Sequence, residues 1–154
     1  MDSNRFENAA RNIGDKVQDV AGNFMQDAPG RLSEAADRAQ EAYGEAFRAL
    51  FETLDWLEMR LGGQRFLCGE RLTEADWRLF TTLIRFDPVY FGHFKRNLRE
   101  IKDYPALQRY LRELYHWPGV AETVDFFHIK HHYYASHLRI NPTSIVPLGP
   151  EIDL

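Results

Sequence analysis

The single cysteine is the residue most able to do covalent chemistry, because a thiolate can act as a nucleophile or exchange disulfides. Cys68 lies in the run Arg65-Phe66-Leu67-Cys68-Gly69, an apolar loop that precedes an expected helix. Reactive thiols need an accessible environment that favours the thiolate, and an apolar loop does not provide one. We therefore expect Cys68 to be a small buried hydrophobe, and we assign no catalytic residue. One cysteine also excludes an internal disulfide.

Four histidines near the C-terminus raise the possibility of a metal site. His128 and His132 are four residues apart, a spacing that places both imidazoles on one helix face, where zinc is often bound. His131 and His137 lie close by in the sequence. A catalytic zinc site needs a third ligand, however, and the His-Glu-x-x-His pattern is missing. We predict that these histidines cap and pack helices and that no metal is bound.

His93 and Lys95 follow Gly92 and form a second basic group. Side chains of this kind either meet an anion or line a solvated edge. We expect the solvated edge, unless a dimer partner covers these residues.

Charge and length exclude several classes of protein. The chain has 154 residues, 19 basic and 23 acidic, for a net charge of −4, which is ordinary for about one domain. Nucleic-acid binding needs clustered Lys and Arg, and no such cluster is present. No segment approaches the roughly 20 apolar residues of a membrane span. The start, Met1-Asp2-Ser3-Asn4-Arg5, leads into no apolar stretch, so we expect a cytoplasmic protein.

Composition divides the chain near residue 40. Of its 21 aromatic residues, only Phe6 and Phe24 precede Tyr43. We expect an Ala- and Gly-rich helical segment over residues 1–40 and a helical domain over 41–154. The first segment predicts an amphipathic helix that Asp27-Ala28-Pro29-Gly30 breaks, with one apolar stripe. That stripe comprises Phe6, Ala10, Ile13, Val17, Val20 and Phe24.

The second part predicts an all-α fold. Apolar residues recur at helical spacing from Leu32 to Leu61, which indicates a helix of roughly 30 residues that ends at Gly62-Gly63. Thr73 and Asp76 form a capping box that opens the next helix. Further helices are expected after Pro105 and through Phe126–Tyr133, followed by an extended tail from Asn141 that contains Pro142, Pro147 and Pro150.

Ordered motifs over residues 40–150 resemble a known family. The Thr-x-x-Asp box after Gly-Glu-Arg-Leu, with Asp103-Tyr104-Pro105-Ala106-Leu107 and Trp117-Pro118-Gly119-Val120, is similar to the helical C-terminal domain of glutathione transferases. The runs Phe86-Asp87-Pro88-Val89-Tyr90-Phe91-Gly92-His93-Phe94 and His128-Ile129-Lys130-His131-His132-Tyr133-Tyr134 resemble the Xi class, the glutathionyl-hydroquinone reductases. This resemblance implies an all-helical bundle.

The first forty residues resemble the small CsbD-like stress proteins of bacteria. The resemblance rests on Gly14-Asp15-Lys16-Val17-Gln18-Asp19 and on Gln40-Glu41-Ala42-Tyr43-Gly44. An Ala-rich solvated helix with one apolar face accounts for the same residues.

The Xi-class resemblance implies a second, thioredoxin-like domain that holds glutathione and a catalytic cysteine in a Cys-Pro-Trp context. This sequence contains no Cys-Pro dipeptide and no βαβ pattern. We therefore expect no cofactor in this chain, with glutathione as the cosubstrate of the family, and no reductase activity from the chain alone.

The resemblance also implies a wall for an aromatic or quinol ligand, in which tyrosine hydroxyls bind the quinol oxygen. The matching positions are Tyr90 and either Tyr133 or Tyr134. The alternative is that these tyrosines pack with their hydroxyls on backbone groups. Where the family usually has Arg, this chain has His131, which removes a fixed positive charge near any anionic ligand.

Three functions follow as hypotheses. The first is a Xi-type helical domain that keeps part of a quinol pocket and forms a homodimer, as the family does. The second is a glutathione-dependent enzyme that works with a thioredoxin-like partner or through Cys68. The third is a stress-related interaction module in which the N-terminal helix covers the surface that a missing domain would occupy. None of the three involves nucleic acid or a membrane.

Overall fold

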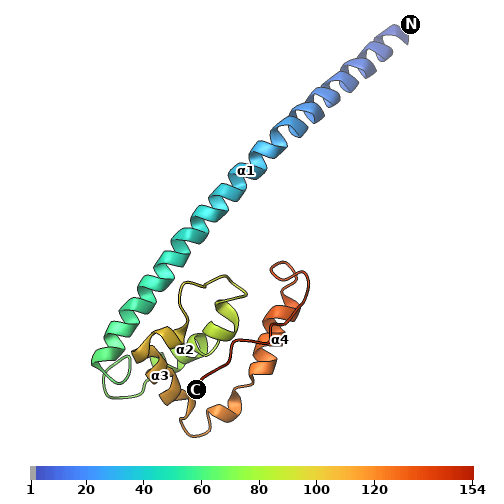
Figure 1. Ribbon diagram of the computed structural model, residues 1–154. Helices are drawn as coiled ribbons and strands as arrows, with labels where there is room; N and C mark the ends of the chain where they lie inside the picture. The colour runs from blue at the N-terminus through green and yellow to red at the C-terminus, as the bar shows by residue number, and fades with distance from the viewer. Residues whose placement is uncertain (1–2) are drawn as a thin grey trace. The chain divides into compact units, whose positions relative to one another are not determined.

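The computed structural model describes the backbone of residues 3–154 and the side chains of residues 32–154 (Figure 1). Within this range it contains helices and one isolated bridge between Phe66 and Gly69 but no strand, which confirms the all-α prediction. Among the described helices, none combines the length and the apolar character that a membrane span requires. The elements are α1 Ser3–Gly63, α2 Glu74–Leu83, the π-helical η1 Phe86–Tyr90, the 3-10 helix η2 Ile101–Asp103, α3 Pro105–Tyr115, the 3-10 helix η3 Ala121–Thr123 and α4 Phe126–Ser136.

The predicted break at Asp27–Gly30 is wrong, because α1 is one continuous helix of 61 residues. Pro29 lacks the N–H that an interior helical residue donates, which costs about 3 kcal/mol. Its fixed φ is nevertheless close to the helical value, and the segments on either side are rich in Ala, the strongest helix former. The apolar stripe from Phe6 to Phe24 lies outside the residues whose side chains are described.

The chain divides into two compact units, Met1–Ala46 and Phe47–Leu154. In the first unit the side chains of residues 32–42 are all exposed, and Leu32 retains 71% of its accessible surface. The apolar rhythm that predicts a helix from Leu32 onward therefore becomes a buried stripe only in the second unit, where Phe51 is 3% exposed.

The core of the second unit lies among the last turns of α1, α2 and α3. Each helix contributes residues three or four positions apart, the spacing that puts side chains on one face. Full burial of each large apolar side chain contributes about 1.5–3 kcal/mol. The most deeply buried members are Leu61, Phe66, Leu83, Phe86, Ile101, Leu107, Tyr110 and Leu114.

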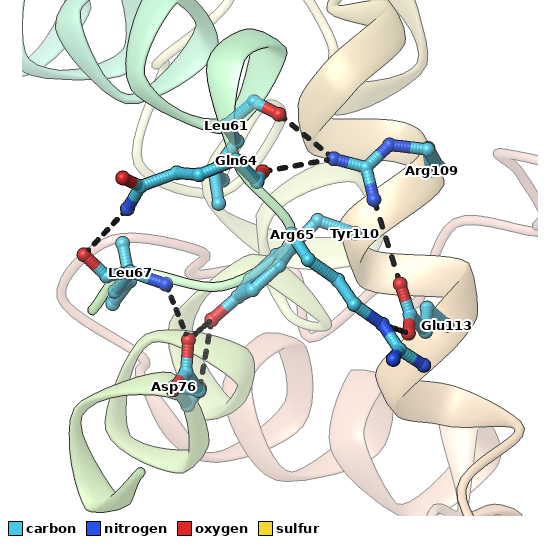
Figure 2. A network of polar contacts seen from close by, with 8 residues as sticks. All are labelled: Leu61, Gln64, Arg65, Leu67, Asp76, Arg109, Tyr110 and Glu113. Carbon is cyan, nitrogen blue, oxygen red and sulfur yellow. Dashed lines mark hydrogen bonds and ion pairs between the residues drawn. The ribbon is translucent and has the colours of Figure 1, made fainter. Parts of the chain in front are cut away.

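A fully buried carboxylate joins the start of α2 to its neighbours (Figure 2). Asp76 Oδ1 accepts hydrogen bonds from the Leu67 amide at 2.8 Å and the Tyr110 hydroxyl at 3.0 Å. Its Oδ2 accepts from the amide and the hydroxyl of Thr73, at 2.8 and 2.9 Å. Burial opposes ionisation, but these four hydrogen bonds outweigh it, so the pKa of Asp76 is lowered. The carboxylate thus ties the preceding loop, α2 and α3 together.

Polar contacts also fix the C-terminal end of α1 to α3. Arg109 donates to the carbonyl oxygen of Leu61 at 2.8 Å, which satisfies one of the last acceptors of α1 (Figure 2). In the other direction, Glu58 accepts from the amides of Ala106 and Leu107 at 2.8 and 2.9 Å. A carboxylate at these free amides complements the positive end of the α3 dipole. Each helix therefore caps the other.

The expected burial of Cys68 is wrong, because its side chain is exposed. The amide and carbonyl of Phe66 pair with those of Gly69 at 2.8 and 3.1 Å, which makes Leu67 and Cys68 the two corner residues of a tight turn. Gly69 has φ +99°, a conformation that glycine adopts without strain. Because the turn buries Phe66, whose side chain is 2% exposed, the corner points Cys68 to the outside.

Replacement of Asp76 by Asn is predicted to lower the free energy of unfolding by about 3 kcal/mol at pH 7. Each carboxylate oxygen receives one backbone N–H, which cannot accept a hydrogen bond, so an amide NH₂ group at either position would leave that N–H without its acceptor. Urea unfolding measures the loss, and Thr73→Ala, which removes one hydroxyl, is the milder control at about 1 kcal/mol.

The stability difference between the parent chain and the Asp76→Asn variant also has a predicted pH dependence. Because the folded pKa of Asp76 is below the unfolded one, the stabilisation is complete above about pH 4 and is lost as the pH falls through the folded pKa. An Asp76→Asn variant as stable as the parent chain at pH 7 would contradict this account.

Candidate functional site

Tyr90 at the end of η1 and Tyr133 in α4 lie close together. A quinol site formed by two tyrosine hydroxyls, as the family resemblance implies, needs this proximity. Their ring centroids are 6.1 Å apart with an edge-to-face angle of 83°. Burial and a hydrogen bond to the Tyr133 hydroxyl raise the pKa of Tyr90 to about 12. Tyr90 is therefore fully protonated at neutral pH, and the two hydroxyls lie side by side.

Tyr134 has different surroundings, although it is next to Tyr133 in the sequence. Its side chain is 9% exposed, and its hydroxyl accepts a hydrogen bond from the backbone of His93. A Cβ atom at Gly92 would lie 2.7 Å from the Tyr134 hydroxyl oxygen, so a side chain at position 92 would displace this hydroxyl. Tyr134 thus makes the kind of backbone contact that a packing role predicts, and it fixes α4 against the loop after η1.

The expectation that His93 lines a solvated edge is wrong. Its side chain is 3% exposed, because it lies one helical turn after Val89, which is fully buried. The Nε2 atom of His93 is 3.2 Å from Nδ1 of His137, and its own Nδ1 is buried with no partner among the described residues. Burial, together with the positive charges of His137 and Lys95, lowers the pKa of His93. His93 is therefore neutral at pH 7.

Aromatic rings surround these polar atoms. Phe94 packs against Tyr90 with centroids 5.6 Å apart and against Tyr133 at 5.8 Å. His93 contacts Phe94 at 4.8 Å and Tyr133 at 6.2 Å. We call Tyr90, His93, Phe94, Tyr133 and His137 the aromatic cluster. It combines ring faces and edges with two hydroxyls, a combination that suits a phenolic ligand.

Asp87, the second residue of η1, holds the loop that leads to η2. Its Oδ1 accepts a hydrogen bond from the Ile101 amide at 2.7 Å. Burial raises the pKa of Asp87 to about 6, and the negative charge of Glu100 adds to this effect. The sequence motif gave no sign of this residue's role, because its partner is 14 positions away.

The C-terminal histidines are not arranged as metal ligands. The described residues contain no group of three or more His, Cys, Asp or Glu side chains that could hold a metal ion. His128 and His132 are exposed on α4. His131 donates from Nδ1 to the Phe127 carbonyl at 2.9 Å and stacks on the ring of Phe127.

Comparisons with known proteins match this helical unit to one family. Residues 40–113 match the family model for the C-terminal domain of glutathione S-transferase. This chain carries that domain. Glutathionyl-hydroquinone reductase PcpF of Sphingobium chlorophenolicum is 60% identical over 111 residues, which are 72% of this chain and 36% of the relative. Glutathionyl-hydroquinone reductase YqjG of Escherichia coli K12 is 55% identical over 116 residues, which are 75% of this chain and 35% of the relative.

Solved structures agree with the glutathione transferase assignment. The glutathione-bound structure of YqjG superposes with a TM-score of 0.73 at 55% identity, covering 74% of this chain and 37% of that one. The Xi glutathione transferase of Phanerochaete chrysosporium superposes with a TM-score of 0.70 at 57% identity, covering 72% of this chain and 36% of that one. The chain thus spans little more than a third of the length of the relatives it matches, and the match lies in its helical domain.

The raised pKa of Asp87 predicts that the stability of the glutathione transferase domain falls as the pH rises. The native state binds the extra proton between the unfolded pKa of about 4 and the folded value of about 6, so stability decreases across this window. Asp87→Asn retains an acceptor for the Ile101 amide and carries no charge. We expect it to be more stable than the parent chain at pH 7.5 by about 1–3 kcal/mol, with the difference vanishing below pH 4.

Thermal unfolding at pH 4 and pH 7.5 measures this difference. Asp37→Asn, on the exposed part of α1, is the matched control and should change neither value. A stability gain for Asp87→Asn that is the same at both pH values would contradict the prediction.

Proposed function

We propose that this domain provides the helical wall of a binding site for a quinol or a related phenol. The observation that carries the proposal is the pair of adjacent hydroxyls of Tyr90 and Tyr133 within the aromatic cluster. Two relatives of this chain are named glutathionyl-hydroquinone reductases, and a hydroquinone is an aromatic ring with hydroxyl groups. The rings of the cluster can pack against the aromatic ring of such a molecule, and the tyrosine hydroxyls can bind its hydroxyl groups.

The two hydroxyls are suited to bind a phenolic oxygen. Tyr90 stays protonated, so its hydroxyl can donate a hydrogen bond, and the neighbouring Tyr133 supplies a second hydroxyl. A quinol oxygen placed between the two hydroxyls can accept from one and donate to the other. The ring of Phe94 lies against both tyrosines and supplies an apolar edge for the aromatic body of the ligand.

The glutathione-dependent step belongs, in this proposal, to a thioredoxin-like partner domain with its own thiolate. Glutathione is bound in the YqjG structure, of which this chain matches 37%. The described residues include no strand from which a thioredoxin-like fold is built. Within this chain, the exposed Cys68 is the rival source of the thiolate.

We further propose that two copies of the chain associate through the helical domain.

Tyr133→Phe is predicted to weaken hydroquinone binding about fivefold to tenfold, because it removes one hydrogen bond from the site. A nuclear magnetic resonance titration with tyrosines labelled at the ring carbon that bears the hydroxyl measures both affinity and place. The signals of Tyr90 and Tyr133 should shift with saturation. Tyr115→Phe, at the C-terminal end of α3 and half-buried against Phe126, is the matched control and should leave affinity unchanged. Equal binding by Tyr133→Phe and the parent chain would refute the site.

The chain alone is predicted to release no hydroquinone from a glutathionyl-hydroquinone in the presence of excess glutathione. The reason is that no cysteine belongs to the aromatic cluster that contains the tyrosine pair. Chromatography of free hydroquinone follows the reaction in the parent chain and in Cys68→Ser. Turnover that disappears in Cys68→Ser would identify Cys68 as the nucleophile. Turnover that survives in this variant would show that the thiolate comes from glutathione directly.

A further inference from the structure

A cavity lies between the first half of α4 and the C-terminal tail, apart from the aromatic cluster. Its volume is about 540 Å³, within the range of small-molecule sites. None of its lining residues is Tyr90, Tyr133 or another member of the aromatic cluster. The cavity is lined by Phe126, Phe127, Lys130, His131, Val146, Pro147, Leu148, Pro150 and Ile152.

One wall of this cavity is aromatic. The rings of Phe127 and His131 are stacked, with centroids 3.8 Å apart and an angle of 30° between their planes. Phe127 remains 71% exposed and Leu148 99% exposed, although apolar side chains of this size gain about 1.5–3 kcal/mol from burial. The cavity therefore offers uncovered apolar and aromatic surface to a ligand.

The charged side chain in the lining of the cavity is positive. Lys130 is the cation in its lining, and no Asp or Glu lines it, although the whole chain has a net charge of −4. The Lys130 ammonium donates one hydrogen bond, to the Leu148 carbonyl oxygen at 2.7 Å, which leaves two of its three protons for another acceptor. This bond also positions the ammonium between α4 and the tail.

We propose that this cavity binds a small aromatic anion, a molecule with aromatic rings that carries a carboxylate or a sulfonate. The stacked wall receives the rings, and Lys130 receives the anionic group. A neutral aromatic compound would leave the ammonium without its charged partner, and a simple anion would leave the apolar wall uncovered. The site adds a ligand function to the domain that does not depend on the tyrosine pair.

Two fluorescent probes of nearly the same size separate these contributions. The first is 1-anilinonaphthalene-8-sulfonate, which carries a sulfonate, and the second is N-phenyl-1-naphthylamine, which lacks it. We expect the sulfonate probe to bind with one site per chain and about tenfold more tightly than the neutral one, since a charge-assisted hydrogen bond adds about this factor. Equal affinity for the two probes would overturn the role of Lys130.

Substitutions then test the location. Lys130→Met should weaken the sulfonate probe about tenfold and leave the neutral probe unchanged, while Lys130→Arg should keep the affinity. Phe127→Ser should weaken both probes and, because Phe127 is exposed, should not change the unfolding temperature. Arg78→Met, on the exposed face of α2, is the matched control for loss of a cation. Sulfonate affinity unchanged in both Lys130→Met and Phe127→Ser would overturn the proposal.

The cavity can also be covered by a second copy of this chain or by the apolar stripe of residues 6–24. In the first case, probe binding would fall as the protein concentration rises, in step with dimer formed in sedimentation velocity. In the second, deletion of residues 1–28 would raise probe affinity in the remaining chain. Either result would overturn the proposal, because the cavity would then be occupied by protein side chains and not by a small ligand. Binding that is independent of both changes supports it.

Discussion

The buried carboxylate of Asp76 is the constraint on which the helical domain depends. Four donors converge on it, from the loop before α2, from the cap of α2 and from Tyr110 in the middle of α3. An ion in an apolar interior is stable only while all its partners are in place. The carboxylate therefore fixes the direction in which α2 leaves the loop, and η1 follows directly from the end of α2. The position of Tyr90 derives from that direction.

The other polar anchors act in the same way on successive elements. Glu58 of α1 holds the first amides of α3, and Asp87 of η1 holds the amide of Ile101 at the start of η2. Each anchor is an acidic side chain on a free backbone amide far away in the sequence. These contacts tie the irregular segment between η1 and α3 to the rest of the domain. The loop in turn places His93 and Phe94 against α4.

Local patterns in the sequence predict the helices well, since helical spacing, the Thr73–Asp76 pair and Pro105 act over a few residues. They fail where the outcome depends on a turn or a distant partner. Cys68 is exposed because the Phe66–Gly69 turn makes it a corner residue, and His93 is buried because a π-helical turn places it after Val89. The family resemblance indicates Tyr90 as a site residue but leaves Tyr133 and Tyr134 open. Only the packing of Gly92 against Tyr134 separates them.

Helix α4 contributes to two separate surfaces, the aromatic cluster and the tail cavity, because its two halves are held by different contacts. Tyr134 docks the second half of α4 on the backbone of His93, which leaves the neighbouring Tyr133 hydroxyl to meet Tyr90. The first half of α4 is held instead by the tail, through the bond from Lys130 to the Leu148 carbonyl. The chain end, dark red in Figure 1, returns from this contact toward α3, where Gln108 donates to the Asp153 carbonyl. Since the two halves are fixed by different partners, a ligand in the tail cavity need not disturb the tyrosine pair.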